Sequence, residues 1–594
     1  MAPESARRPA ALSLTLGDCA GWLHGTSGET GVLLCSPWGF EELCLRRAWR
    51  MLADNLADAG YPTLRFDYPG CGDSLGDPEK VAGLASLVEA ARLGADTLRK
   101  AGVRRLVIIG QGLGATVAAL AAPSVEAEGL ALLAPPARGR DYLRELSAWG
   151  AMVAETMHLP ADIAAPGAVA GFALPDGLRT SLSVANLLDL AQAPAPQVLV
   201  AARPGRPGDT RLAERLRQLG AQVAEVAYAG YEAALGNPTA AHAPVDVIAA
   251  VTDWMQSRFP AQAGEASTLP ALDQLRTATF RETAVRIGPH QLFGVLCEPQ
   301  GRRRGDTVLL LGSGGDPHVG WARSHVDYAR ELAAAGVASL RLDSREAGDS
   351  PGPLSAEPLQ LYDESQVEDA LSAVDWLERQ GLGPVLPVGR CSGAFMAFHA
   401  ALRDSRIGRI ILVNQRRFIW DRQGGVEAAL DKVGHYQRQV RDPLKLLVRW
   451  VRGDLNLEAA LARLGPAMLM KLRGILGGHR RGLACRTLDA FRTLEKRGVA
   501  ISMLYCRGGE GHADLNALLG QDGGPLKQLN NVERIWLDGA DHGLTPVAAR
   551  RRLLDLILAT ALTGEVSAVS AQNAPAEAED LALGLAAPGG ALAA

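Results

Sequence analysis

The chain has 594 residues, of which 47% are hydrophobic, and a formal net charge of −4. This length allows more than one buried core, and the charge is unremarkable for it. No stretch reaches the roughly 18 unbroken apolar residues of a membrane span, and the first residues lack the apolar segment of a secretory signal.

The eight cysteines are scattered along the chain, and none forms a Cys-x-x-Cys pair. This pattern indicates neither a zinc site nor a disulfide framework. A reducing compartment would keep such thiols free. We therefore expect a cytoplasmic protein with no transmembrane segment, no metal and no other cofactor.

The sequence repeats itself at long range. The segment Ala57–Asp67 matches Ala333–Asp343, and the elbow-like segment Val107–Gly114 matches Leu386–Gly393. Between them, Gly-Asp-Ser occurs at both Gly72 and Gly348. An offset this long indicates two copies of a whole domain rather than a solenoid.

The repeat predicts four regions. These are a first domain at 1–259, a linker at 260–275 that is small and polar, a second domain at 276–562, and a tail at 563–594. The tail is rich in Ala, Gly and Pro without periodicity, and we predict that it is disordered.

In the first copy, a predicted strand ends in Gly110-Gln111-Gly112-Leu113-Gly114. Gly112 stands where the second copy carries a reactive side chain. Tyr231 and Glu232 stand where a histidine is expected after the last strand, and Asp209 occupies the position of a possible acid. We predict that this copy is degenerate and acts as a scaffold, an interface or an accessory binding domain.

In the second copy, apolar runs alternate with helical patterns. The predicted strands and the helix at 324–335 imply a mostly parallel sheet covered by helices on both faces. The strands are expected at 307–311, 338–342, 384–388, 409–414, 500–505 and 532–537.

The most informative motif is Gly389-Arg390-Cys391-Ser392-Gly393, which follows one of these strands and precedes a helix. Strand, Gly-x-nucleophile-x-Gly and helix together form the nucleophile elbow of α/β-hydrolases. Cys391 occupies the nucleophile position. The alternatives are a buried structural thiol at Cys391 or Ser392 as nucleophile, whose position just after the apex points its side chain away.

A thiol nucleophile needs a base, and chain order in this fold is nucleophile, acid, histidine. The last strand ends in Gly-Ala-Asp-His-Gly and presents His542 as the base. The preceding loop offers Glu510 as the acid, with Asp514 in reserve, although Gly509 stands where related sequences usually place Asp. A Cys–His pair can also work without a third member.

An oxyanion hole needs two backbone N–H groups. One is predicted at Ser392, directly after the nucleophile. The other is predicted at Ser313 or Gly314, in the glycine-rich loop that follows the strand at 307–311.

The segment at about 415–498 interrupts the strand–helix rhythm where this fold inserts a lid. It carries 18 Lys and Arg against 8 Asp and Glu. This excess is either a solvated helical surface or a funnel for an anionic acyl substrate, free or carrier-bound. The candidate binding residues are Arg416, Arg417, Arg480 and Arg481. No aromatic stripe accompanies the charge, so nucleic acid is not expected.

These motifs make the chain resemble the bacterial α/β-hydrolases that accompany exosortase and exopolysaccharide gene clusters. The resemblance is carried by the Gly-x-Cys-Ser-Gly-Ala elbow and by Leu412–Trp420 in the second copy, and more loosely by Pro37–Glu42 in the first. It implies two tandem α/β-hydrolase domains, the second with a helical lid.

The sequence thus predicts an ester or thioester hydrolase, or an acyltransferase, that uses Cys391 and His542. The alternative is a non-catalytic binding or assembly protein that has kept the hydrolase fold. The substrate and the oligomeric state are not encoded in these motifs.

Overall fold

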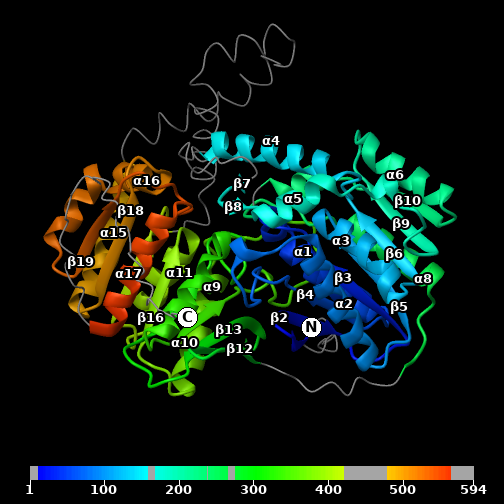
Figure 1. Ribbon diagram of the computed structural model, residues 1–594. Coiled ribbons are helices and arrows are strands. Elements are labelled where there is room, and N and C mark those ends of the chain that lie inside the picture. The colour runs from blue at the N-terminus through cyan, green and yellow to red at the C-terminus, as the bar shows by residue number, and fades with distance from the viewer. Residues whose placement is uncertain (1–10, 158–167, 237, 265–273, 420–477, 564–594) are drawn as a thin grey trace, which may run out of the picture.

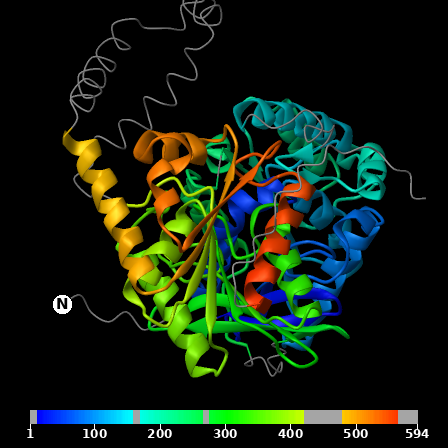
Figure 2. The same ribbon diagram turned by 90° about the vertical axis from the view of Figure 1, so that its left-hand side faces the viewer.

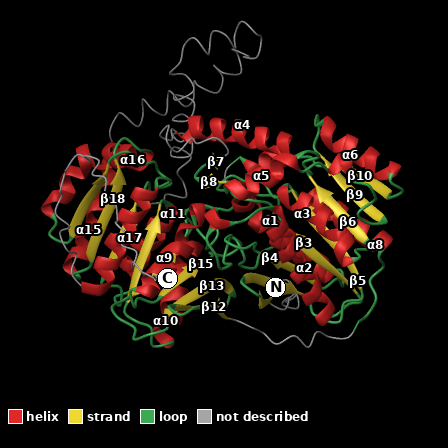
Figure 3. Cartoon of the chain, in the orientation of Figure 1, coloured by secondary structure: helices red, strands yellow, loops and turns green. Residues whose placement is uncertain are grey.

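The computed structural model describes residues 11–157, 168–236, 238–264, 274–419 and 478–563. The predicted tail beyond 563, the middle of the predicted lid and most of the predicted linker lie outside these residues. Within them, strands build two large sheets, which Figures 1 and 3 show side by side with helices around each.

The first sheet has eight strands in the order β1-β2-β4-β3-β5-β6-β9-β10. All neighbours pair in parallel except at β2, which is antiparallel to both β1 and β4. The strands are β1 (Leu12–Leu16), β2 (Cys19–His24), β3 (Thr30–Cys35), β4 (Thr63–Phe66), β5 (Arg105–Gln111), β6 (Gly129–Leu133), β9 (Gln197–Ala202) and β10 (Gln222–Ala227).

The helices of this half surround the sheet, and a small hairpin lies beside α4. The hairpin consists of β7 (Ala168–Val169) and β8 (Phe172–Ala173). The helices are α1 (Phe40–Asp58), α2 (Leu84–Lys100), α3 (Leu113–Ala121), α4 (Gly139–Met157), α5 (Asp176–Val184), α6 (Pro207–Gln218), α7 (Tyr231–Leu235) and α8 (Val245–Arg258).

The second sheet has nine strands in the order β11-β12-β13-β15-β14-β16-β17-β18-β19. Apart from the edge strand β11, this order repeats that of the first sheet strand for strand. The strands are β11 (Gln274–Arg276), β12 (Phe280–Ile287), β13 (Leu292–Pro299), β14 (Thr307–Leu311), β15 (Ser339–Leu342), β16 (Val385–Arg390), β17 (Arg409–Val413), β18 (Ala500–Cys506) and β19 (Val532–Leu537).

The side chains of β14 point alternately to the two faces of the sheet, which explains why helices cover both faces. Leu309 and Leu311 belong to a core shared with α10, α11 and α15, whereas Val308 and Leu310 face α9 and α17. Successive side chains of a strand point to opposite faces, so a continuous apolar run requires two layers of helices. The helices are α9 (Ser324–Ala334), α10 (Glu364–Arg379), α11 (Ser392–Arg403), α15 (Gly478–Lys496), α16 (Glu510–Leu519) and α17 (Val547–Thr563).

Figure 2 shows α15 and α17 on opposite sides of this sheet. The predicted lid range of 415–498 includes α15, but Phe491 and Leu494 of this helix are buried in the core and Phe491 packs against Phe398. Residues 478–496 therefore cover the sheet rather than the site.

The chain has the α/β-hydrolase fold: a mostly parallel sheet in this strand order with helices on both faces, present in both halves. The predicted strands and the predicted helix of the second copy agree with the observed elements to within about two residues at each end. In the described part of the chain, no helix combines the length and apolar character needed to span a bilayer.

Candidate functional site

Cys391 lies at the bend between β16 and α11. Its backbone has φ 54° and ψ −110°, a conformation that L-residues rarely adopt and that is often found at functional sites. Gly389 and Gly393 are both required here, because a Cβ on Gly389 would lie 2.2 Å from the Gly393 carbonyl carbon and one on Gly393 would lie 2.5 Å from the Leu311 oxygen. The strained turn predicted from the motif is therefore present.

The Cys391 thiol is partly exposed and has two polar neighbours. The His542 side chain lies close enough to interact with the thiol, and the Tyr362 hydroxyl lies 3.3 Å from Sγ. Burial raises the pKa of the thiol, but attraction to His542, aided by Tyr362 and Arg390, outweighs it and lowers the pKa to about 6. The structure thus brings together the predicted nucleophile and the predicted base.

His542 follows β19 in a loop whose backbone groups are held by hydrogen bonds. Its carbonyl oxygen accepts hydrogen bonds from Asn414 Nδ2 at 3.1 Å and from Arg390 at 3.4 Å. The neighbouring Asp541 carboxylate accepts the N–H groups of Gly543 and Thr545. The ring Nδ1 is buried without a hydrogen-bond partner in the described part of the chain.

The two predicted acids lie on the first turns of α16. Glu510 and Asp514 both bind the guanidinium of Arg416, at 2.8 Å and 2.7 Å. Both carboxylates are therefore engaged with a cation in this structure, and a role for either as partner of His542 stays a prediction.

The predicted oxyanion donors lie around the N-terminus of α11. Ser392 is the first residue of this helix, and its hydroxyl accepts the Gly314 N–H at 2.7 Å. Ser313 is buried, and its carbonyl accepts the Asp316 N–H at 2.9 Å. The loop and the helix are therefore in contact as predicted, but the Gly314 N–H already has an acceptor.

The four predicted substrate-binding arginines are not all comparable. Arg416 and Arg417 are half-buried, and Arg416 is neutralised by the two acids of α16. Arg481 is exposed on α15, and the side chain of Arg480 lies outside the described residues. An anionic substrate therefore stays a prediction.

Three residues at the site were given no role in the sequence analysis. Tyr362 comes from the long connection between β15 and α10. Arg390 and Asp316 form an ion pair at 2.6 Å beside the site. Burial raises the pKa of Asp316 to about 6, although attraction to Arg390 and His542 partly opposes this rise. Their proximity to the elbow and to the glycine loop was the only available signal.

The corresponding place in the first half is filled by a carboxylate. Gly112 has φ 54°, like Cys391, but a Cβ there would lie 2.4 Å from Glu41 Oε2. Glu41 is buried and accepts hydrogen bonds from Gln111 at 3.1 Å and Tyr231 at 3.3 Å. Burial raises the pKa of Glu41 to about 7, although the hydrogen bonds from Gln111 and Tyr231 oppose this rise. The nucleophile position of this half is thus occupied by a side chain from α1.

Asp209, at the possible acid position of the first half, is also engaged. It binds the Arg203 guanidinium at 3.0 Å, and that guanidinium lies 5.5 Å from the ring centroid of Tyr231. Together with Glu41, these groups form a closed polar network without a reactive side chain at Gly112.

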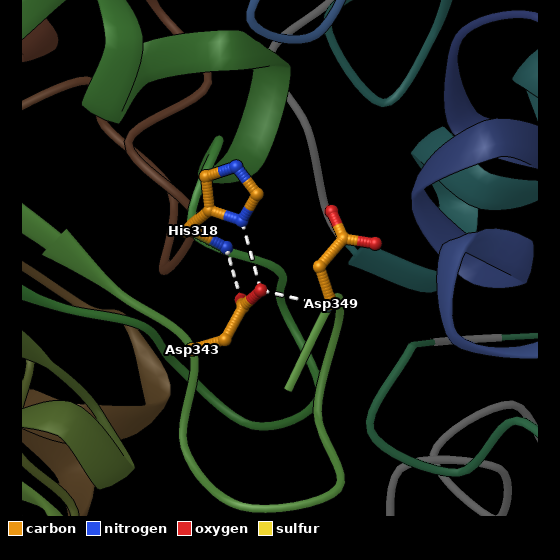
Figure 4. A group of neighbouring side chains, drawn as sticks. All are labelled: His318, Asp343 and Asp349. Carbon is orange, nitrogen blue, oxygen red and sulfur yellow. Dashed lines mark hydrogen bonds and ion pairs between the residues drawn. The ribbon is translucent and has the colours of Figure 1, made fainter. Parts of the chain in front are cut away.

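A second polar cluster joins the two halves. Figure 4 shows His318, Asp343 and Asp349, whose ligand atoms lie close enough to hold a metal ion. However, His318 Nδ1 is bonded to Asp343 at 2.8 Å and Nε2 to Asp73 at 2.7 Å. Although burial opposes it, attraction to these carboxylates raises the pKa of His318 to about 10. The ring is an imidazolium with no free lone pair, so the cluster is an ion-pair network.

Comparison with known proteins agrees with the fold. Residues 38–166 match the family described as serine aminopeptidase, S33. This segment lies in the first half and includes Gly112 in place of a nucleophile. A search of curated proteins gives no match.

Solved structures resemble less than half of the chain each. An α/β serine hydrolase homologue from Coxiella burnetii is 14% identical over 48% of this chain and 98% of its own, with a TM-score of 0.29. An esterase from Pyrobaculum calidifontis is 18% identical over 42% and 86%, with a TM-score of 0.31. A proline iminopeptidase-related protein from Thermus thermophilus is 21% identical over 42% and 98%, with a TM-score of 0.29. These similarities carry no information about activity, and the resemblance to exosortase-associated hydrolases stays a prediction.

Proposed function

We propose that the protein is a cysteine-dependent acyl hydrolase or acyltransferase that acts on an ester or a thioester. The observation that carries this proposal is the contact between Cys391 and His542 at a strained elbow, with the thiol pKa lowered to about 6. A buried thiol without such a neighbour has the opposite shift: burial raises the pKa of Cys35 to about 12.

The reaction begins with transfer of the thiol proton to His542. The sulfur electron pair of Cys391 then forms a bond to the substrate carbonyl carbon, and the carbonyl oxygen becomes an oxyanion near the Ser392 N–H at the start of α11. Collapse expels the alcohol or thiol, which takes its proton from the imidazolium, and leaves an acyl-thioester on Cys391.

The second step decides between the two activities. Water attacks the thioester in a hydrolase, whereas an alcohol, an amine or another nucleophile attacks it in a transferase. In both cases His542 takes the proton of the attacking group and returns it to the Cys391 sulfur. The expected substrate is a small or carrier-bound acyl compound, and the excess of Lys and Arg over Asp and Glu at 415–498 supports an anionic one.

We also propose that the two halves are copies of one domain, the first at about 1–259 and the second at about 276–562. The strand order of the two sheets, the same apart from the edge strand β11, supports the duplication. Glu41 in the nucleophile position supports the inactivity of the first copy.

The test is formation of an acyl-enzyme, measured by intact mass after incubation with an activated ester. The wild-type protein should gain one acyl group, and Cys391→Ala should gain none. Cys485→Ala is the matched control, since Cys485 is an exposed thiol on α15. Labelling that persists in Cys391→Ala would refute the assignment.

A non-catalytic role is the second candidate, and two observations favour it. His542 Nδ1 has no partner in the described residues, and the Gly314 N–H is already bonded to Ser392. A wild-type protein that binds acyl compounds but never becomes acylated would support this role.

A further inference from the structure

We infer that the first half positions reacting loops of the second half, directly through Thr239 at the oxyanion loop and indirectly by holding Trp321, a second-half residue beside the His542 loop. This inference rests on the proposed function, since it concerns the same site. It gives the half without a nucleophile a definite task.

The first contact is made at the glycine loop. A Cβ on Gly314 would lie 2.2 Å from Thr239 Oγ1, and one on Gly315 would lie 2.4 Å from the Pro238 oxygen. The connection between α7 and α8 of the first half therefore packs directly on the loop that carries the predicted oxyanion donor. The Ala243 N–H, bonded to the Ala356 oxygen at 3.1 Å, holds this connection against the second half.

The second contact is made by Trp321, which belongs to the second half but is buried in the hydrophobic core of the first. Its indole N–H donates to the Ala170 oxygen at 2.9 Å, in the turn between β7 and β8. Its ring lies 5.5 Å from that of Phe40 on α1. The indole is thus fixed by first-half atoms.

Trp321 in turn contacts the residue next to the nucleophile. The Arg390 guanidinium lies 5.9 Å from the Trp321 ring centroid, and it binds Asp316 and the His542 carbonyl oxygen. A continuous set of contacts therefore runs from Ala170 through Trp321 and Arg390 to His542.

The turn between β7 and β8 also reaches the histidine loop directly. A Cβ on Gly171 would lie 2.6 Å from Thr545 Cγ2. The Thr545 hydroxyl donates to Asp541 at 2.9 Å, and Asp541 organises the loop that presents His542. The loop that presents the base and the loop that carries the oxyanion donor are thus both packed against the first half.

The energetic reason is the accuracy that catalysis demands. A displacement of about 1 Å in a reacting group can cost on the order of 100-fold in rate, and loss of one oxyanion donor costs about 100- to 1,000-fold. Loops held only by their own half have fewer fixed neighbours than loops packed against a second sheet.

The experiment compares three variants of the full chain in acyl-enzyme formation from an activated ester: Trp321→Phe, Thr239→Ala and the control Trp22→Phe. Trp22 also lies between the halves, in edge contact with Phe293, but it is not among the residues around Cys391. Thermal unfolding of each variant shows whether the fold is kept.

The two site variants should differ in kind. Trp321→Phe should lower the acylation rate about tenfold or more and raise the pH midpoint of Cys391 alkylation, because the His542 loop loses its support. Thr239→Ala should lower kcat about tenfold with KM and the alkylation midpoint unchanged, and Thr239→Ser should restore the rate. Trp22→Phe should form the acyl-enzyme at the wild-type rate, and its melting temperature should be similar to that of the wild-type protein.

Two outcomes separate the inference from the proposed function. A wild-type protein that never forms an acyl-enzyme refutes the proposed function. A wild-type protein that does so, with Trp321→Phe and Thr239→Ala reacting at the rate of Trp22→Phe, refutes only the positioning role.

Discussion

The guanidinium of Arg341 lies 2.5 Å from the carboxylate of Asp73, although 268 residues separate them. The reciprocal pair, Arg65 and Asp349, is formed at 2.8 Å. Arg341 and Arg65 occupy equivalent positions of the two repeats, on β15 and β4, and the two aspartates belong to the repeated Gly-Asp-Ser segments. The two halves therefore bind each other through the same pair of residues used twice.

Removal of one member of this pair should destabilise the protein strongly. Arg341 is fully buried, and Arg341→Ala leaves Asp73 with a weaker set of partners in a dry environment. We expect a loss of about 3–5 kcal/mol in the free energy of unfolding, measured by urea denaturation. Arg551→Ala, which removes an exposed pair with Glu331, should cost less than about 1 kcal/mol. Equal costs for the two variants would contradict this account.

The His318 imidazolium makes the contact between the halves sensitive to alkaline pH. Its pKa is about 10 in the folded protein against 6.5 ordinarily, so its stabilising contribution is complete below about pH 6.5 and is lost as the pH rises toward 10. Asp73 and Asp343 face the ring, with Arg341 close to Asp73. The melting temperature of the wild-type protein should fall over this range more steeply than that of His318→Gln. Parallel curves would rule out a charged ring.

The Cys391 thiol should be reactive at mildly acidic pH. With a pKa of about 6, the rate of iodoacetamide alkylation should rise through a midpoint near pH 6. In His542→Ala only burial and weaker neighbours remain, so the midpoint should move above about 8.5, the ordinary cysteine value. The site of alkylation is read by peptide mass spectrometry, and a midpoint that does not respond to His542→Ala would exclude the pair.

The acid can be identified by neutral substitutions on α16. Because Glu510 and Asp514 both bind Arg416, we expect Glu510→Gln and Asp514→Asn each to lower kcat/KM less than about threefold. The measurement is steady-state ester hydrolysis. A fall of about 100-fold in one variant alone would instead identify that residue as the partner of His542.

Ser392→Ala separates the two candidate nucleophiles of the elbow. The Ser392 hydroxyl accepts the Gly314 N–H, and its removal frees that donor for an oxyanion. The acylation rate should stay within about threefold of the wild type or rise. Complete loss of acylation, with the fold intact by circular dichroism, would transfer the nucleophile role to Ser392.

The local features of the site were readable from the sequence. Gly389 and Gly393 predicted the tight bend, because only glycine tolerates the approach of Leu311 and of the following helix. Alternating apolar strands and helices predicted the fold, since apolar runs such as 307–311 need cover on both faces. The repeat around Asp67 and Asp343 predicted a second sheet of the same order.

Contacts between distant segments were decided only by tertiary structure. The sequence offered Glu510 and Asp514 as partners of His542 but gave no sign that both bind Arg416, or that Nδ1 of His542 has no partner in the described residues. The sequence also gave no sign that the Glu41 side chain fills the space beside Gly112. A motif specifies the backbone over a few residues, whereas a charge partner is chosen by every element that packs around it.

The chain by itself thus determined two hydrolase sheets and a cysteine at the apex of one bend, because these depend on local spacing and periodicity. Only the tertiary structure decided that Thr239 and Ala170 of one half lie against the loops of the other. The physical reason is that the relative placement of two sheets depends on contacts between buried charges and aromatic rings that are hundreds of residues apart in the sequence. Local sequence patterns do not predict such contacts.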